Sequence, residues 1–375
     1  MKYYLIAGEA SGDLHGSNLI RELRQLDTRA TIRCWGGDLM QAAGGELVKH
    51  YRDLAFMGFA EVVKNLPTIL RNIRFCKDDI SQWQPDAVIL IDYPGFNLRI
   101  AEWAKQQGLR VIFYISPQVW AWKENRVKKM KQYIDRMLCI LPFEKKYYRE
   151  RWNWEVEYVG HPLVEVIEKA RQQPAPPEID ALPAKPLIAL LPGSRKQEIA
   201  VKLPIMLSVA DAFPDHQFVV AQAPGLDESF YGTFFQNRHN VSAVHNQTYA
   251  LLNRASAALV TSGTATLETA LFGVPQVVCY KGSNISYQIA RRLIRIKYIS
   301  LVNLIMDRPV VTELIQHELT KENLVKELRA IVSDRDRIQT LQQEYARLKN
   351  LLSEGGRASA NAAESIYAFI SERKG

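Results

Sequence analysis

The sequence predicts an α/β protein with two doubly wound domains, each built on a parallel sheet. Short apolar runs rich in β-branched residues alternate with stretches of helical periodicity, which is typical of parallel strands covered by helices. The runs form two sets, separated by a proline-rich stretch over 171–186 that cannot be a helix interior or a central strand. Ligands of such sheets bind at the carboxyl ends of strands, so we expect a ligand cleft between two facing domains.

The predicted elements follow one another in a regular order. The strands are Tyr3–Ala7, Ala87–Ile91, Val111–Ile115 and Met137–Leu141 in the first set, and Leu187–Leu191, Gln217–Ala221, Ala257–Val260 and Val274–Tyr280 in the second. The predicted domains are 1–170 and 187–350, with 171–186 as the linker between them. A last unit, 351–375, holds the breaker Gly355-Gly356 and a final helical segment.

Composition limits the function classes. The 375 residues are 47% hydrophobic and 23% charged, as in folded globular proteins. A net charge of +8 favours anionic partners such as nucleic acid, phosphorylated metabolites or an acidic membrane surface. The four cysteines lack the spacing of zinc or dithiol sites, so we expect reduced core thiols. The N-terminal apolar run is too short for a signal peptide, and no run of about 18 apolar residues predicts a membrane span.

Polar residues follow the first strand of the first domain. Its turn contains Gly8, Glu9, Ser11, Gly12 and Asp13. Glycines at a strand-to-helix turn let backbone N–H groups approach an anion or a polar ligand, although a tight turn alone also needs glycine.

A carboxylate, Asp92, follows the strand Ala87–Ile91 directly. At this position partial burial could raise its pKa enough for general-base action on a hydroxyl. Capping of the next helix is the other role open to Asp92.

An aromatic turn follows the next strand, over 116–123. Trp120 and Trp122 are spaced two apart, so at least one of them is expected to line a ligand surface or an interface; packing over a helix end is the alternative. The basic residues after this turn, Arg126, Lys128, Lys129 and Lys131, are open to interpretation as a solvated helix face.

The second domain has two loops suited to phosphate. After Leu187–Leu191, Gly193 keeps the backbone close and Arg195 presents a planar fork to phosphate oxygens. Hydroxyl groups and a glycine open the helix after Val260, and Glu268 one turn inside could hold ribose hydroxyls or only favour the helix N-terminus. Together with Asp92, these loops match a glycosyltransferase that uses a nucleotide-activated sugar.

The motifs resemble, in order and over nearly the whole chain, those of lipid-A-disaccharide synthases. The segments that carry this resemblance are Ala7–Asp13, Ile91–Asn97, Ser116–Trp122, Leu141–Glu144, Val159–Pro162, Leu191–Arg195 and Ser262–Glu268. The resemblance implies the GT-B architecture, in which an N-terminal acceptor domain faces a C-terminal UDP-sugar domain and a final helix crosses back to the N-terminal domain.

The resemblance also implies an activity and its residues. The family are inverting hexosyltransferases of lipopolysaccharide assembly in Gram-negative bacteria. They transfer 2,3-diacylglucosamine from its UDP donor to the 6-hydroxyl of 2,3-diacylglucosamine 1-phosphate (lipid X), forming a β-1,6 disaccharide. By matching position, Asp92 is the general base. The expected UDP-sugar contacts are Arg195, Ser262, Gly263, Thr264, Glu268, Lys281 and Asn303; the expected acceptor or cleft residues are the turn residues above with Asn97, Gln118, Trp120 and His161.

Two positions depart from the family pattern. Gly95 stands where an acidic residue is common, which leaves the acceptor contacts nearby open, and Lys281 stands where arginine is frequent, which loses a bidentate fork. His161 is open to either an acid–base or a structural role. Because no Asp-x-Asp cluster occurs, we expect neither a metal nor another cofactor.

Acylated substrates need an apolar dock near a membrane. The candidate residues are Phe56, Phe59, Val63 and Leu66 on one helical stripe, Met57 in the same segment, Arg71 and Arg74 beside the stripe, and Arg291, Arg292 and Arg295 in a basic amphipathic segment. An ordinary buried helix is the alternative for the stripe. The pattern predicts a cytoplasmic enzyme attached peripherally to anionic phospholipids of the inner membrane. It predicts no nucleic-acid partner and leaves a homodimer open.

Two alternatives to the synthase stay open. Another GT-B enzyme that uses UDP-N-acetylglucosamine, an epimerase or a transferase, shares the nucleotide loops but handles water-soluble sugars. A non-catalytic basic membrane-binding protein would instead bind lipid without consuming a UDP-sugar.

Overall fold

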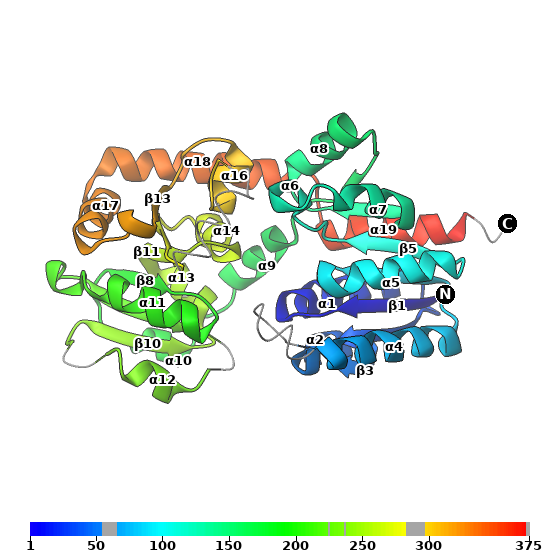
Figure 1. The fold of residues 1–375 in the computed structure, drawn as a ribbon. Coiled ribbons are helices and arrows are strands. Elements are labelled where there is room, and N and C mark those ends of the chain that lie inside the picture. Colours follow the sequence, from blue (N-terminus) through cyan, green and yellow to red (C-terminus); the bar gives the residue numbers. More distant parts are fainter. Residues whose placement is uncertain (55–65, 224–225, 236–237, 283–296, 373–375) are drawn as a thin grey trace. The chain divides into compact units, whose positions relative to one another are not determined.

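The computed structural model describes residues 1–54, 66–223, 226–235, 238–282 and 297–372. Its contacts divide the chain into two compact units, Met1–Pro162 with Leu352–Gly375, and Leu163–Leu351. Each unit is built around one sheet whose described strands all run parallel (Figure 1).

The sheet of the first unit has the strand order β3-β2-β1-β4-β5-β6-β7 in the described residues. Its strands are β1 (Lys2–Ala7), β2 (Thr31–Gly36), β3 (Glu46–His50), β4 (Ala87–Ile91), β5 (Arg110–Tyr114), β6 (Arg136–Cys139) and β7 (Glu157–Tyr158). Its helices are α1 (Ala10–Leu26), α2 (Asp38–Ala42), α4 (Leu66–Trp83), α5 (Pro94–Gln106), α6 (Val119–Trp122), α7 (Arg126–Tyr133), α8 (Pro142–Trp152) and α19 (Ala358–Ser371), with a 3-10 turn at Tyr51–Leu54.

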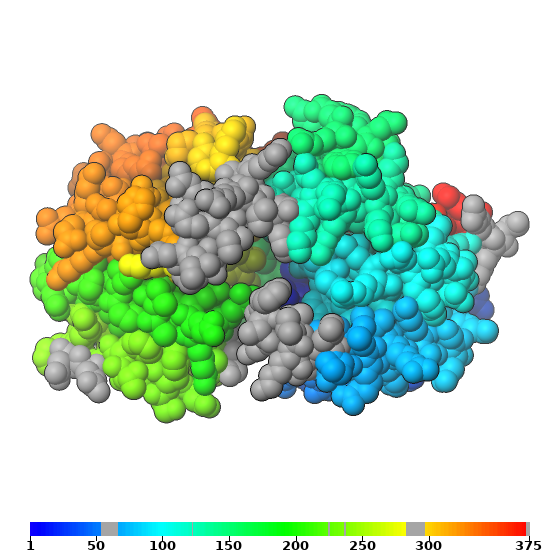
Figure 2. All heavy atoms as spheres, in the orientation of Figure 1, coloured from blue at the N-terminus to red at the C-terminus, as the bar shows by residue number. Residues whose placement is uncertain are grey.

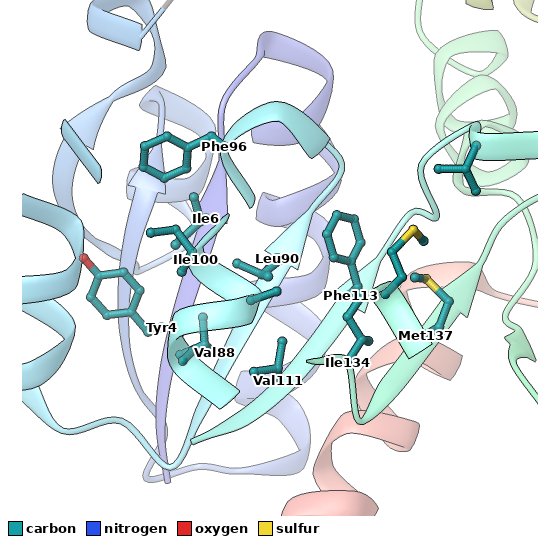
Figure 3. Packing of buried hydrophobic residues seen from close by; sticks show 14 of the residues in the cluster. Tyr4, Ile6, Val88, Leu90, Phe96, Ile100, Val111, Phe113, Ile134 and Met137 are labelled. Carbon is teal, nitrogen blue, oxygen red and sulfur yellow. The ribbon is translucent and has the colours of Figure 1, made fainter. Parts of the chain in front are cut away.

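Helices cover both faces of this sheet, because alternate strand residues point to opposite sides. On one face, Tyr4 and Ile6 of β1 pack in a cluster with Phe96 and Ile100 of α5 (Figure 3). On the other face, Leu5 belongs to a second cluster that includes side chains of α1 and α19. Burial on both sides explains why the central strands read as continuous apolar runs in the sequence.

The C-terminal helix α19 completes the first unit. Small buried residues, Ala362 and Ala363, let it pack closely in the same apolar cluster as α1. Polar contacts flank this packing, since Arg357 pairs with Glu22 of α1 at 2.6 Å. The chain therefore returns to its first unit after the second one is complete, since Leu352–Gly375 belongs with Met1–Pro162.

The sheet of the second unit has the strand order β10-β9-β8-β11-β12-β13 in the described residues. Its strands are β8 (Leu187–Leu191), β9 (Gln217–Gln222), β10 (Val241–His245), β11 (Ala255–Thr261), β12 (Gln276–Tyr280) and β13 (Thr312–Ile315). Its helices are α9 (Pro162–Arg171), α10 (Pro177–Asp180), α11 (Lys196–Leu207), α12 (Glu228–Gly232), α13 (Thr248–Arg254), α14 (Thr264–Leu271), α16 (Leu301–Met306), α17 (Lys321–Ser333) and α18 (Arg335–Ser353), with 3-10 turns at Ala210–Ala212 and Gln316–Glu318.

The proline-rich stretch 171–186 belongs to the second unit, whereas the sequence suggested a linker outside both domains. Ile179 is fully buried, and Arg254 at the end of α13 donates to the carbonyl oxygens of Leu182 at 3.3 Å and Pro183 at 3.2 Å. These bonds attach the stretch to the second unit, so the boundary between the units lies earlier, at Leu163.

The direction of winding reverses at one point in each sheet. In the first sheet β1 lies beside β4, and in the second β8 lies beside β11. A reversal of this kind leaves a crevice at the carboxyl ends of the two strands, which is where open α/β sheets bind ligands. The loops after these strands are therefore the places to look for function.

Candidate active site

Two carboxylates lie at the reversal point of the first sheet. Glu9 follows β1 and Asp92 follows β4. Partial burial, and then the negative charge of Glu9, raise the pKa of Asp92 to about 6, while a hydrogen bond from the backbone N–H of Tyr93 acts in the opposite direction. A carboxylate with such a pKa is ionised at neutral pH yet keeps the proton affinity that a general base needs.

The backbone that carries Asp92 is held in an unusual conformation. Asp92 and Tyr93 have φ values of 46° and 50°, in the left-handed region that residues other than glycine rarely adopt. The buried amide of Asn97 donates to the carbonyl oxygens of Asp92 at 2.7 Å and Ile6 at 3.3 Å, and so ties the ends of β1 and β4 together. Strained backbone of this kind clusters at functional sites.

Two residues of the turn after β1, Gly8 and Asp13, have structural roles. A Cβ added at Gly8 would lie 2.3 Å from the ring of Tyr93, so glycine lets the two strand ends approach. The carboxylate of Asp13 accepts backbone N–H groups of Gly37 at 2.8 Å, Leu39 at 3.1 Å and Met40 at 3.0 Å, which stabilises the start of α2. Asp13 is thus engaged within the fold, whereas Ser11 at the same turn is exposed and Gly12 is buried.

His161 is buried in the first unit close to His15 of α1. Burial, and then the charge of His15, lower the pKa of His161 to about 3, and burial lowers the pKa of His15 to about 4. Both imidazoles are therefore neutral at neutral pH, which leaves His161 as a neutral hydrogen-bonding group rather than a cation.

The aromatic turn is anchored by a buried carboxyl. Trp120 donates its indole N–H to Oε1 of Glu144 at 3.1 Å, and the backbone N–H of Leu141 donates to the other oxygen at 3.0 Å. Burial raises the pKa of Glu144 to about 7. Gln118 is exposed at this turn.

A pocket of about 500 Å³ lies at the reversal point of the second sheet. The residues that line it include Gly193, Ser194, Arg195, Ser262, Gly263, Thr264 and Glu268. Gly263, with φ of 128°, immediately precedes the N-terminus of α14, whose free N–H groups favour an anion. The pocket falls within the range of about 300–1,000 Å³ that is typical of small-molecule sites.

Three charged side chains of α11 and its preceding loop form a cluster, of which Arg195 and Glu198 line this pocket. The carboxylate of Glu198 lies 3.3 Å from Nη1 of Arg195 and 3.6 Å from Nζ of Lys202. Lys202 is buried and also donates to the hydroxyl of Thr261 at the end of β11. Burial lowers the pKa of Lys202, while Glu198 acts in the opposite direction. The carboxylate of Glu198 therefore lies between two cations, Arg195 and Lys202.

Glu268 forms the wall between this pocket and a neighbouring pocket of about 430 Å³. It accepts a hydrogen bond from the hydroxyl of Tyr249 at 3.0 Å, and burial raises its pKa. Its position fits a carboxylate that accepts hydroxyl groups of a ligand.

The other two residues expected to contact the UDP-sugar lie elsewhere. Asn303 is buried: its amide donates to the carbonyl oxygen of Val311 and to Glu313, both at 2.9 Å, and accepts from the N–H of Val311. Its amide is thus engaged within the fold. Lys281 follows β12 and is half-buried, outside the residues that line the 500 Å³ pocket.

Most of the expected acyl dock lies outside the described residues. This applies to Phe56, Met57, Phe59, Val63, Arg291, Arg292 and Arg295. Leu66 begins α4, on which Arg71 and Arg74 are exposed. Among the described residues, no helix is both long enough and apolar enough to cross a membrane.

Sequence reasoning assigned no role to Glu198, Lys202 or Tyr249. A signal for the first two was available, because Arg195, Glu198 and Lys202 have the spacing i, i+3 and i+7 of one helix face. The sequence held no such signal for Tyr249, because only the folded structure places its hydroxyl within hydrogen-bonding distance of Glu268. The described part of the chain holds no group of three or more His, Cys, Asp or Glu side chains suited to a metal ion.

Comparison with known proteins decides the family. A family model described as lipid-A-disaccharide synthetase matches residues 3–368. The lipid-A-disaccharide synthase of Acidobacterium capsulatum is 39% identical over 390 residues, covering 99% of this chain and 96% of the relative. That of Syntrophus aciditrophicus is 38% identical over 369 residues, covering 96% of both chains. The chain belongs to the lipid-A-disaccharide synthase family.

Solved structures extend this result to the fold. A UDP-GlcNAc 2-epimerase from Neisseria meningitidis bound to UDP-GlcNAc superimposes with a TM-score of 0.67 at 12% identity, covering 100% of both chains. The glycotransferase of kitacinnamycin gives a TM-score of 0.67 at 16% identity and 98% coverage of both chains. The chain is therefore a glycosyltransferase of GT-B fold, and the family, fold class and enzyme class predicted from the sequence are confirmed.

Proposed function

We propose that the chain transfers 2,3-diacylglucosamine from UDP-2,3-diacylglucosamine to the 6-hydroxyl of lipid X, with inversion at the anomeric carbon. Membership of the lipid-A-disaccharide synthase family supports this reaction. The observation that carries it is the carboxylate of Asp92 at the reversal point of the first sheet, with a pKa raised to about 6.

In this mechanism Asp92 accepts the proton of the acceptor 6-hydroxyl as that oxygen attacks the anomeric carbon. The bond between this carbon and the UDP oxygen breaks in the same displacement, so no covalent enzyme intermediate forms. The strained loop held by Asn97 fixes the base before the substrate arrives, which supports preorganised catalysis.

The departing UDP needs positive charge near its diphosphate. Arg195 and the N-terminus of α14 at Gly263 line the 500 Å³ pocket and are suited to this role. Ser262 and Thr264 add hydroxyl donors, and Glu268 is suited to ribose hydroxyls. We propose that this protein charge serves in place of a metal ion, so that a chelator leaves the rate unchanged.

The acylated substrates imply work at a membrane surface. We propose peripheral attachment to an anionic cytoplasmic leaflet through α4. Leu70 and Phe75 of this helix are 55% and 47% exposed, beside the exposed side chains of Arg71 and Arg74. Exposed apolar side chains next to cations are typical of helices that lie in a membrane interface.

The test of the function compares donors in detergent solution. We expect UDP to be released from UDP-2,3-diacylglucosamine only when lipid X is present, with no turnover of UDP-N-acetylglucosamine. Equal turnover of the water-soluble donor, or its epimerisation without an acceptor, would assign the chain to a different reaction. Lipid binding without any consumption of a UDP-sugar would exclude an enzyme.

A further inference from the structure

A pocket of the first unit begins two residues after Asp92 in the sequence, at Pro94. It has a volume of about 210 Å³ and lies between α5 and α7. Pro94 and Gly95 line its end near Asp92, and Tyr133 and Ile134 line the end near the close of α7. Figure 2 shows the cyan stretch of chain that contains α5 at the surface of this unit.

The floor of this pocket is apolar. Ala101 of α5 and Met130 of α7 are each 1% exposed and belong to the core cluster on this face of the sheet. Leu98 packs against the same cluster. A floor built from core side chains is fixed in shape and suits a hydrocarbon segment.

The rim of the pocket is cationic. Arg99, Arg126 and Lys129 all line it. Burial, and then the charge of Arg99, lower the pKa of Arg126, so the two guanidinium groups are close enough to repel each other. The carboxylate of Glu102 also lines the pocket and lies 3.8 Å from Lys129. Positive charge therefore predominates at the rim.

Arg99 brings its charge to the N-terminus of α5, the helix that begins two residues after Asp92. Its Nη1 donates to the carbonyl oxygen of Gly95 at 2.7 Å, so the side chain folds back along α5 to the first turn of the helix. Gly95 is three residues from Asp92 in sequence. The N-terminus of a helix already carries partial positive charge, so a guanidinium there adds to a potential that attracts an anion.

We propose that this pocket binds the phosphate of the phosphorylated acceptor between Arg99 and Arg126, with the first part of one acyl chain on the apolar floor. The inference rests on the proposed function and adds the position of the acceptor phosphate. Guanidinium forks match phosphate oxygens, and a dianion between two like charges relieves their repulsion.

The size of the pocket agrees with this assignment. At about 210 Å³ it lies below the range of about 300–1,000 Å³ for complete ligands, so it takes only part of the acceptor. The sugar then stays outside, over the N-terminus of α5, on the side where Asp92 lies. A phosphate bound by Arg99 thus positions the acceptor hydroxyl for Asp92.

The test measures binding of lipid X in neutral detergent micelles by calorimetry. Arg99→Gln and Arg126→Gln are each expected to raise the Kd about tenfold, because each removes a charge-assisted contact with phosphate. Lys129→Gln is expected to weaken binding, whereas the neighbouring Lys128→Gln, which changes an exposed lysine of the same helix outside the pocket, is not. Arg99→Lys should recover part of the loss, which shows that the site still folds.

A ligand without phosphate and micelles with an anionic lipid show whether the bound phosphate belongs to the acceptor or to a membrane headgroup. With 2,3-diacylglucosamine that lacks the phosphate, the parent and the Arg99→Gln variant should bind alike. If the variant weakens binding of this ligand equally, or leaves binding of lipid X unchanged, the proposal is overturned. A loss confined to micelles that contain phosphatidylglycerol would assign the pocket to membrane headgroups and would also overturn it.

The transfer reaction is measured separately from binding. UDP release by the parent enzyme tests the proposed function, whereas the binding titrations test the pocket even if no transfer occurs. In kinetic terms, the pocket variants should raise the KM for lipid X about tenfold and leave the KM for the donor within about twofold.

Discussion

Glu9 and Asp92 follow neighbouring parallel strands, and the charge of Glu9 adds to burial in raising the pKa of Asp92 to about 6. In this pair the carboxylate of Glu9 raises the pKa of the carboxylate of Asp92. A general base works best when its pKa lies near the operating pH, so the pair gives Asp92 a greater proton affinity than an exposed aspartate has.

This pairing predicts the pH dependence of the transfer. Protonation removes the base, so kcat/KM should fall as the pH decreases through about 6. Glu9→Gln removes the negative charge that raises the pKa of Asp92, and the acidic limb should move to lower pH. Rates of both proteins are measured from about pH 5 to pH 8.

The comparison between the two proteins is the control. The phosphate of lipid X itself titrates near pH 6, but this contribution is the same for parent and variant. An identical acidic limb in the Glu9→Gln variant would show that Glu9 does not tune the base.

Asp92 should reduce the stability of the fold. Its pKa is higher in the folded chain than the ordinary value of 3.8, so the folded state disfavours the charged form, and stability is lost as the pH rises from about 4 to about 6. Asp92→Asn should therefore raise the free energy of unfolding by up to roughly 3 kcal/mol near neutral pH and by little near pH 4. Urea denaturation at both pH values measures the difference; equal gains at both would contradict the shifted pKa.

Glu198 should compete with the diphosphate. Its carboxylate pairs with Arg195 and Lys202 at the edge of the pocket. Glu198→Gln removes a like charge and should tighten UDP binding about fivefold, on the order of 1 kcal/mol. Lys202→Met removes a buried cation and should weaken UDP binding about tenfold. Calorimetric titration with UDP measures both affinities.

Lys185→Met serves as the matched control, because Lys185 is exposed and donates to the carbonyl oxygen of Pro214. The Lys185→Met variant should bind UDP with the same affinity as the parent protein. Weaker UDP binding by the Glu198→Gln variant would mean that Glu198 positions Arg195 instead of competing with the ligand.

Asn303 should matter for stability. Its buried amide makes three hydrogen bonds with Val311 and Glu313, so Asn303→Ala leaves buried polar groups without partners and should cost about 2–4 kcal/mol of unfolding free energy. Urea denaturation tests this, with Asn350→Ala, an exposed residue of α18, as the control. Unchanged stability together with weaker UDP binding would instead make Asn303 a ligand contact.

The sequence predicted the central strands well because both of their faces are buried. Ala87–Ile91 and Leu187–Leu191 have the predicted bounds. The strands that were not predicted contain polar residues: β2 includes Arg33, and β13 begins Thr312-Glu313. Their side chains are satisfied by tertiary contacts, such as the 3.1 Å ion pair of Arg33 with Asp79, which periodicity cannot indicate.

The candidate site was predicted where chemistry follows directly from position in the chain. Asp92 and Arg195 stand in loops at the carboxyl ends of strands, so the parallel sheet alone brings them to ligand-binding edges. Asp13 and Asn303 could not be judged in this way. Asp13 accepts a hydrogen bond from the backbone N–H of Gly37, and Asn303 accepts one from that of Val311. Only the tertiary structure reveals these partners.

The central claim is that Asp92 is the base of an acceptor-dependent transfer. The most direct measurement is UDP release from UDP-2,3-diacylglucosamine with and without lipid X, for the parent, Asp92→Asn and the exposed control Asp78→Asn. We predict that the parent and Asp78→Asn show the same acceptor-dependent release. Asp92→Asn should bind UDP normally but lose at least about 100-fold of this rate. Release by the parent without lipid X, or a full rate in the Asp92→Asn variant, would contradict the account.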